Sequence, residues 1–146
     1  MTLFRTYILG IILLALAFGQ ISCRKYEDGP NFSLRSKEER VVNTWLAQSV
    51  FRNDLDETGQ YTSYSMVFER NGRFSWIITP EIGDPIIVGA AWELTSLNLQ
   101  IKLTFDEKDP ISGETRLLYM DIRRLTENEL WLSYLFEGDY YDLKLN

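Results

Sequence analysis

Acidic side chains at short spacing are the residues best suited to chemistry in this sequence. Asp54, Asp56 and Thr58 alternate along the chain and Gly59 follows, which is the order of the first half of a calcium loop. The position that would need a bidentate glutamate holds Ser65 instead. We therefore interpret this run as a polar turn rather than a metal site.

The remaining reactive residue types do not combine into an active site. Asp106, Glu107 and Asp109 could contribute to a weak divalent site, but a solvated loop explains them better. A carboxylate pair could act on sugars, yet no pair stands out. The sequence has no histidine and one cysteine, which excludes Ser-His and Cys-His nucleophiles and the usual zinc sites. We predict a protein that is not an enzyme and uses no metal or cofactor.

The single cysteine, Cys23, follows an apolar run over residues 7–18 that has the length of a signal-peptide core. The letters QISC that end the run resemble the lipobox of bacterial lipoproteins, whose cysteine is acylated and becomes the new N-terminus. The resemblance implies a signal peptide over 1–22 and lipidation of Cys23. It also implies attachment to a bacterial membrane of the cell envelope, and the outer membrane is the expected one. An uncleaved anchor and a conventional secreted protein remain open.

Composition limits what the rest of the chain can be. Without residues 1–22, 124 of the 146 residues remain, enough for one domain with a real core. Arg5 is the only charged residue in the removed segment, so the formal net charge goes from −6 to −7. An acidic chain disfavours nucleic acid as a partner. Residues 23–34 have no apolar period and indicate a flexible tether, and the domain is expected over 35–146.

Apolar periodicity predicts an all-β domain after one short helix. Ser36 and Glu39 form a capping-box pattern, which predicts a helix over about 36–42. Alternating apolar and polar residues then predict eight strands, and Asn71-Gly72 predicts a type I′ hairpin turn. The strands are expected near 44–51, 61–70, 74–78, 88–94, 97–105, 118–122, 130–134 and 141–145. Eight such strands in an antiparallel up-and-down meander can close into a small barrel.

The order of these features resembles the lipocalin-like domains of small bacterial lipoproteins. The tether, the short helix, Asn43-Thr44-Trp45 at the first strand, Trp92-Glu93-Leu94 and the stretch 125–132 carry the resemblance. It implies that the ring of Trp45 plugs the base of the barrel beside the helix. It also implies a lipid-anchored, non-enzymatic binding domain with a small apolar or amphiphilic ligand in the barrel mouth.

Large aromatic residues lie on the inward face of the predicted strands. They could wall a pocket for a small apolar, cationic or sugar-like ligand. The pocket candidates are Tyr64, Phe68, Phe74, Trp76, Trp92, Tyr134 and Tyr141. Side chains alone can also fill eight strands, and the number of rings favours a mostly filled interior.

A filled barrel would have a different function. It would be an interaction or scaffold lipoprotein that contacts a protein or glycan through its long acidic loops or its outer aromatics. The outer aromatics are Tyr119, Trp131 and Tyr140. A cavity of several hundred Å³ would favour ligand binding over this alternative.

The meander also predicts which way the barrel points. The long connections, near 52–60, 80–85 and 106–114, should share the end opposite the tether. The mouth would then face away from the membrane. Acidic residues such as Asp106 are expected at this end and basic residues such as Arg73 at the other, so the mouth should suit cationic or neutral partners.

Overall fold

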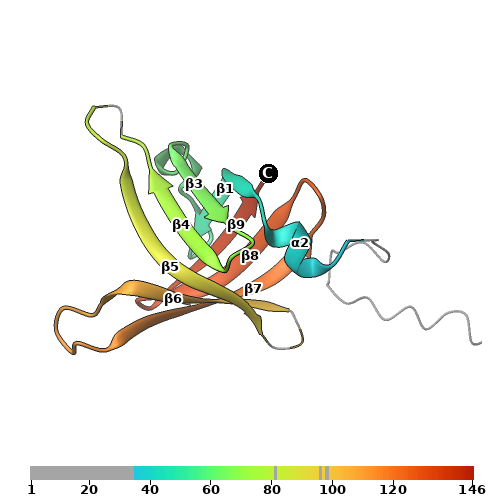
Figure 1. Cartoon of the computed structure of the whole chain (residues 1–146). Helices are drawn as coiled ribbons and strands as arrows, with labels where there is room; N and C mark the ends of the chain where they lie inside the picture. The colour runs from blue at the N-terminus through green and yellow to red at the C-terminus, as the bar shows by residue number, and fades with distance from the viewer. Residues whose placement is uncertain (1–34, 81, 96, 98) are drawn as a thin grey trace, which may run out of the picture.

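Antiparallel pairing of successive strands builds one sheet that closes on itself (Figure 1). The computed structural model describes residues 35–146 except 81, 96 and 98. Cys23, the predicted signal peptide and the predicted tether lie outside these residues. The elements are α2 (Lys37–Val41), β1 (Thr44–Arg52), β2 (Leu55–Asp56), a 3₁₀ helix (Thr58–Gln60), β3 (Tyr64–Phe68), β4 (Arg73–Ile78), β5 (Ile86–Thr95), β6 (Gln100–Lys108), β7 (Thr115–Leu125), β8 (Leu130–Phe136) and β9 (Asp139–Leu145).

The strand order is β2-β1-β3-β4-β5-β6-β7-β8-β9, and an additional pairing of β1 with β9 closes the barrel. The closing register runs from Ala47 opposite Leu145 to Arg52 opposite Tyr141, with one irregularity between Ala47 and Ser49. The predicted eight-stranded meander is therefore confirmed. Two small elements were not predicted, the two-residue strand β2 and the 3₁₀ helix, because their sequence has the composition of a polar turn.

The turn between β3 and β4, at Asn71-Gly72, is not the predicted type I′ turn. Only Gly72 has a positive φ there (+83°), while the Glu69 amide donates to Arg73 O (2.9 Å) and the Gly72 amide donates to Glu69 O (3.1 Å). This is a three-residue loop that ends in the left-handed conformation. Positive φ at both central residues occurs instead at Glu137-Gly138, between β8 and β9.

The helix and Trp45 close one end of the barrel. Ser36 Oγ accepts from the Glu39 amide (3.1 Å) and Glu39 Oε2 accepts from the Ser36 amide (2.9 Å), which confirms the capping box. Trp45 is fully buried and its Nε1–H donates to Val41 O at 2.9 Å. Arg40 Nη1 donates to the carbonyl of Leu125 at 2.7 Å. Trp45 therefore plugs the base beside the helix, as predicted.

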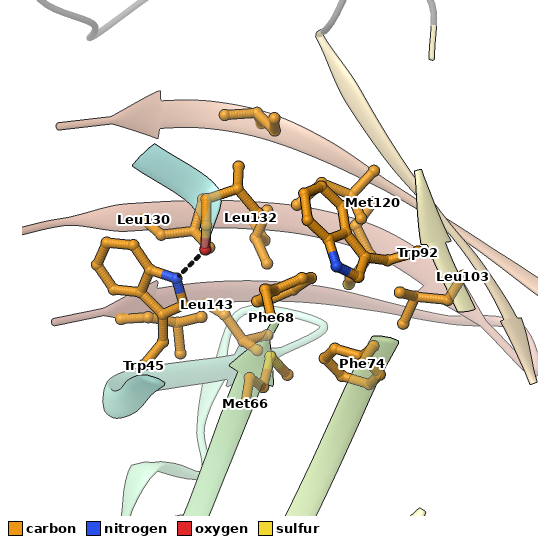
Figure 2. Close-up of a cluster of buried hydrophobic side chains, with 14 of the residues drawn as sticks. Trp45, Met66, Phe68, Phe74, Trp92, Leu103, Met120, Leu130, Leu132 and Leu143 are labelled. Atoms are coloured by element: carbon orange, nitrogen blue, oxygen red, sulfur yellow. Dashed lines mark hydrogen bonds between the residues drawn. The ribbon is translucent and has the colours of Figure 1, made fainter. Parts of the chain in front are cut away.

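Aromatic rings fill the half of the barrel next to this plug (Figure 2). Phe68 packs against Phe74 with ring centroids 4.8 Å apart, and meets Trp92 edge-on at 5.6 Å. Trp92 Nε1–H donates to Glu69 O at 2.9 Å, so its one polar group is satisfied. Burial of these rings makes this half a packed core.

The two ends of the barrel are unlike each other. The β4–β5 and β6–β7 loops extend at the end away from α2 (Figure 1), as the meander predicted. The predicted division of charge is wrong for one pair, since Arg73 binds Asp106 through two hydrogen bonds of 3.0 and 2.7 Å. Staggered strands bring the two together across β5, because Arg73 is level with Thr104 on β6. Arg73 also lowers the pKa of the Asp106 carboxyl.

We expect Trp92→Ala to lower the free energy of unfolding by about 3–5 kcal/mol, because it empties the packed half of the barrel. Tyr119→Ala removes an exposed ring from the outer face and should change it by about 0.5 kcal/mol or less. Urea unfolding of both variants measures this difference. Equal costs would contradict the placement of Trp92 in the core.

Candidate functional site

A cavity of about 300 Å³ opens at the end of the barrel away from α2. Its wall is formed by Tyr61, which follows the 3₁₀ helix, and by residues of strands β3 to β9. Ile78, Val88 and Leu118 supply aliphatic surface. Three groups of aromatic side chains supply the rest, and each group comes from neighbouring parts of the sheet.

The first group is Tyr61, Tyr64 and Trp76. The ring centroids of Tyr61 and Tyr64 are 4.8 Å apart, and those of Tyr64 and Trp76 are 6.2 Å apart. Burial raises the pKa of the Tyr61 hydroxyl. The indole N–H of Trp76 is buried and has no acceptor among the described residues. This part of the wall is therefore a row of three aromatic rings in contact, with two hydroxyls and one indole N–H as its polar groups.

The second group is the pair Tyr134 and Tyr141, from opposite positions on β8 and β9. Their rings stack 5.1 Å apart with an angle of 12° between the planes. Burial strongly raises the pKa of the Tyr134 hydroxyl, which therefore stays protonated through neutral pH. The pKa of nearby Arg52 is raised by the Glu57 carboxylate, which lies 2.6 Å away, and further by the Tyr141 hydroxyl.

The third group surrounds a charge. Arg116, at the start of β7, lies over the rings of Phe105 from β6 and Phe136 from β8, at 5.6 and 5.8 Å from their centroids. Arg116 makes no hydrogen bond or salt bridge with any described residue, although its charge contributes to the lowered pKa of Asp109 on the β6–β7 loop. Among the described residues, neither aspartate nor glutamate lines the cavity. The described part of the wall thus carries one cation, several hydroxyls and no carboxylate.

Four of the seven predicted pocket residues meet in this cavity: Tyr64, Trp76, Tyr134 and Tyr141. The structure places the other three, Phe68, Phe74 and Trp92, in the packed core next to the plug. All seven point inward, but the position along the barrel axis decides whether a ring meets open space. A residue near the α2 end faces the plug and its neighbours, and a residue near the open end faces the cavity.

Sequence reasoning missed Tyr61, Phe105, Arg116 and Phe136 as wall residues. The signal for Arg116 was present in the alternation of β7. Arg116 stands two residues before Leu118, and Leu118 is buried and inward, so both share one face of the strand. A charged residue at an inward position is easily read as the end of the apolar pattern.

In each of the two candidate metal motifs, an aspartate accepts hydrogen bonds from backbone amides of its own loop. Asn53 and Asp54 both have positive φ and form the turn between β1 and β2, and Asp56 Oδ1 accepts from the Thr58 amide at 2.9 Å. The structure therefore confirms a polar turn. Asp109 Oδ1 accepts from the Ser112 amide (2.7 Å), which lowers the pKa of Asp109. Within the described residues, no three potential ligands group as a metal site would require.

The outer aromatics do not form one continuous platform. Tyr119 and Tyr140 are exposed on the outer face of β7 and β9. Trp131 on β8 is flanked by cations, with Arg124 at 5.1 Å and Lys144 at 4.5 Å from its ring. Its faces are therefore already in contact with side chains of the protein.

Solved structures that share this fold include two from Bacteroides species. The chain matches a lipocalin-like protein from Bacteroides uniformis ATCC 8492 with a TM-score of 0.53 and 16% identity, covering 72% of this chain and 97% of that one. It matches an uncharacterized protein from Bacteroides eggerthii DSM 20697 with a TM-score of 0.54 and 15% identity, covering 72% and 98%. No protein-family model and no curated protein matches the sequence.

The domain is therefore a lipocalin-like barrel, as the sequence resemblance implied. In the part of the chain that the structure describes, no helix is long and apolar enough to span a membrane.

We expect Tyr134→Phe to change the alkaline limb of the stability curve. The pKa of Tyr134 is raised in the folded state, so the unfolded tyrosine, with a pKa of about 10, ionises first. Its contribution to stability is complete below that pH and is lost as the pH rises above it. Between about pH 9 and 11 the wild type should lose more stability than the variant. Urea unfolding across this range measures both curves, and parallel curves would contradict a desolvated hydroxyl.

Proposed function

We propose that this protein is a non-enzymatic binding protein that holds a small apolar or amphiphilic ligand at the open end of its barrel. The observation that carries the proposal is the cavity of about 300 Å³ with its three groups of aromatic side chains. Ligand pockets are commonly lined by apolar and aromatic surface with a few polar groups. This wall has that composition.

The size of the cavity limits the size of the ligand. Ligand pockets span roughly 300–1,000 Å³, so this one is at the small end of the range. The same volume of liquid water would hold about ten molecules. A ligand of about ten non-hydrogen atoms therefore fits, whereas a long lipid would extend into solvent.

The alternative of a filled interaction barrel is less well supported. Only the half of the barrel next to Trp45 is packed, and the other half keeps its cavity. On the outer surface, Trp131, Asp106 and Asp109 already interact with other residues of the protein. They are therefore less available to contact a partner. The described residues of the cavity wall include no carboxylate, which also favours binding over acid–base catalysis.

Attachment to a membrane through Cys23 is the second part of the proposal. It is supported by the apolar run before the cysteine and by the resemblance of QISC to a lipobox. Two or three acyl chains anchor a protein stably where one would not. Because the described chain begins beside α2, a tether there would leave the cavity facing away from the membrane of the bacterial cell envelope.

A cavity-filling variant tests the binding function. Val88→Trp should abolish binding of 1-octanol, because its ring would occupy the cavity. Ile87→Trp adds the same ring to the outer face of the same strand and should bind like the wild type. Isothermal titration calorimetry on the full chain in neutral phospholipid nanodiscs, with empty discs as the blank, measures both. Equal binding by the two variants would contradict the proposal.

Cys23→Ala tests the anchor. The variant should lose acylation and leave the membrane fraction, because no other cysteine exists to take its place. Mass spectrometry of the N-terminal peptide and fractionation of cells measure the two effects. An unmodified Cys23 in the wild type would show that the lipoprotein hypothesis is wrong.

A further inference from the structure

The charge of Arg116 in the cavity wall indicates the chemistry of the ligand. We propose that the cavity takes a small amphiphilic anion, specifically a monocarboxylate with an apolar body. Its carboxylate pairs with Arg116 and its body lies against the rings of the opposite wall. This inference rests on the proposed binding function and adds the class of ligand to it.

The position of Arg116 suits it to bind an anion. Phe105 and Phe136 contact the guanidinium from the two strands that flank β7, at 5.6 and 5.8 Å. A guanidinium that lies over the faces of aromatic rings can still donate hydrogen bonds from its N–H groups. Its N–H edge matches the two oxygens of a carboxylate, and charge-assisted pairs of this kind are among the stronger hydrogen bonds.

Arg116 differs from the other cation near the cavity. Arg52 is already paired with Glu57 at 2.6 Å and lies 3.7 Å from Asp139. Arg116 has no such partner among the described residues. The nearby loop acid Asp109 accepts from the amides of Ser112 and Ile111 and from the Ser112 hydroxyl, all through Oδ1. The charge of Arg116 contributes to the lowered pKa of Asp109, but the two side chains form no hydrogen bond or salt bridge.

The acidic surface of the protein does not override this local charge. The formal net charge is −6, and most of the described aspartates and glutamates are exposed to solvent. At physiological ionic strength, exposed charges are largely screened beyond about 8 Å. An anion inside the cavity would be next to Arg116, and no described carboxylate lines the wall around it. The preference for cationic partners expected from the acidic loops therefore does not extend to the cavity.

Octanoate and 1-octanol test the carboxylate and the apolar body of the ligand separately, since both have the same chain length and only octanoate carries a charge. In the full chain in nanodiscs, octanoate should bind about 10-fold or more tightly than octanol. Arg116→Met should remove that advantage and leave octanol binding within about 2-fold. Lys108→Met removes an exposed cation from neighbouring β6 and should leave octanoate within about 2-fold.

The protonation of the bound ligand supplies an independent measurement. Octanoate labelled with ¹³C at the carboxyl should show a lower pKa when bound to the wild type than when free, and Arg116→Met should abolish that lowering. Octanol binding without an octanoate advantage would overturn the anion inference and leave the binding function intact. So would octanoate binding that Arg116→Met does not weaken. Binding of neither ligand would overturn both.

Discussion

Pairing of β1 with β9 is the contact on which the rest of the structure depends. It turns an open meander into a barrel and removes the two long edges that would otherwise be exposed. Further bonds reinforce both ends of this seam. The Leu46 amide donates to Asn146 O at 2.9 Å, and the Asn53 amide donates to Tyr140 O at 2.8 Å. Once the sheet is closed, every inward residue must either fill the interior or line a space within it.

The two ends of the closed sheet then meet different neighbours. At one end α2 and Trp45 cover the opening, so the inward rings there pack against one another and against the plug. At the other end, in the part of the chain that the structure describes, no α-helix covers the opening. The rings there stack along the wall, as Tyr134 does on Tyr141, and leave the centre empty. The cavity is thus a consequence of plugging a barrel at one end only.

The sequence predicted the strand faces well because a period of two determines which side chains point inward. It could not separate Phe68, which is in the core, from Tyr64, which is in the cavity wall, since both follow the same alternation. That distinction depends on the height of each residue along the tilted strands. The contact of Arg73 with Asp106 has the same origin, because stagger joins residues that a flat meander keeps apart. Arg116 was missed because its charge interrupts the apolar pattern without leaving the inward face.

The central claim is that the open half of the barrel holds a ligand while the plugged half is packed. Anomalous diffraction from crystals soaked with octanoate carrying bromine on its terminal carbon tests this claim most directly. The account predicts a bromine peak inside the cavity, among Trp76, Tyr134 and Val88, and none in the plugged half. A bromine peak on the outer face near Tyr119 and Tyr140, with none in the cavity at saturating ligand, would contradict it.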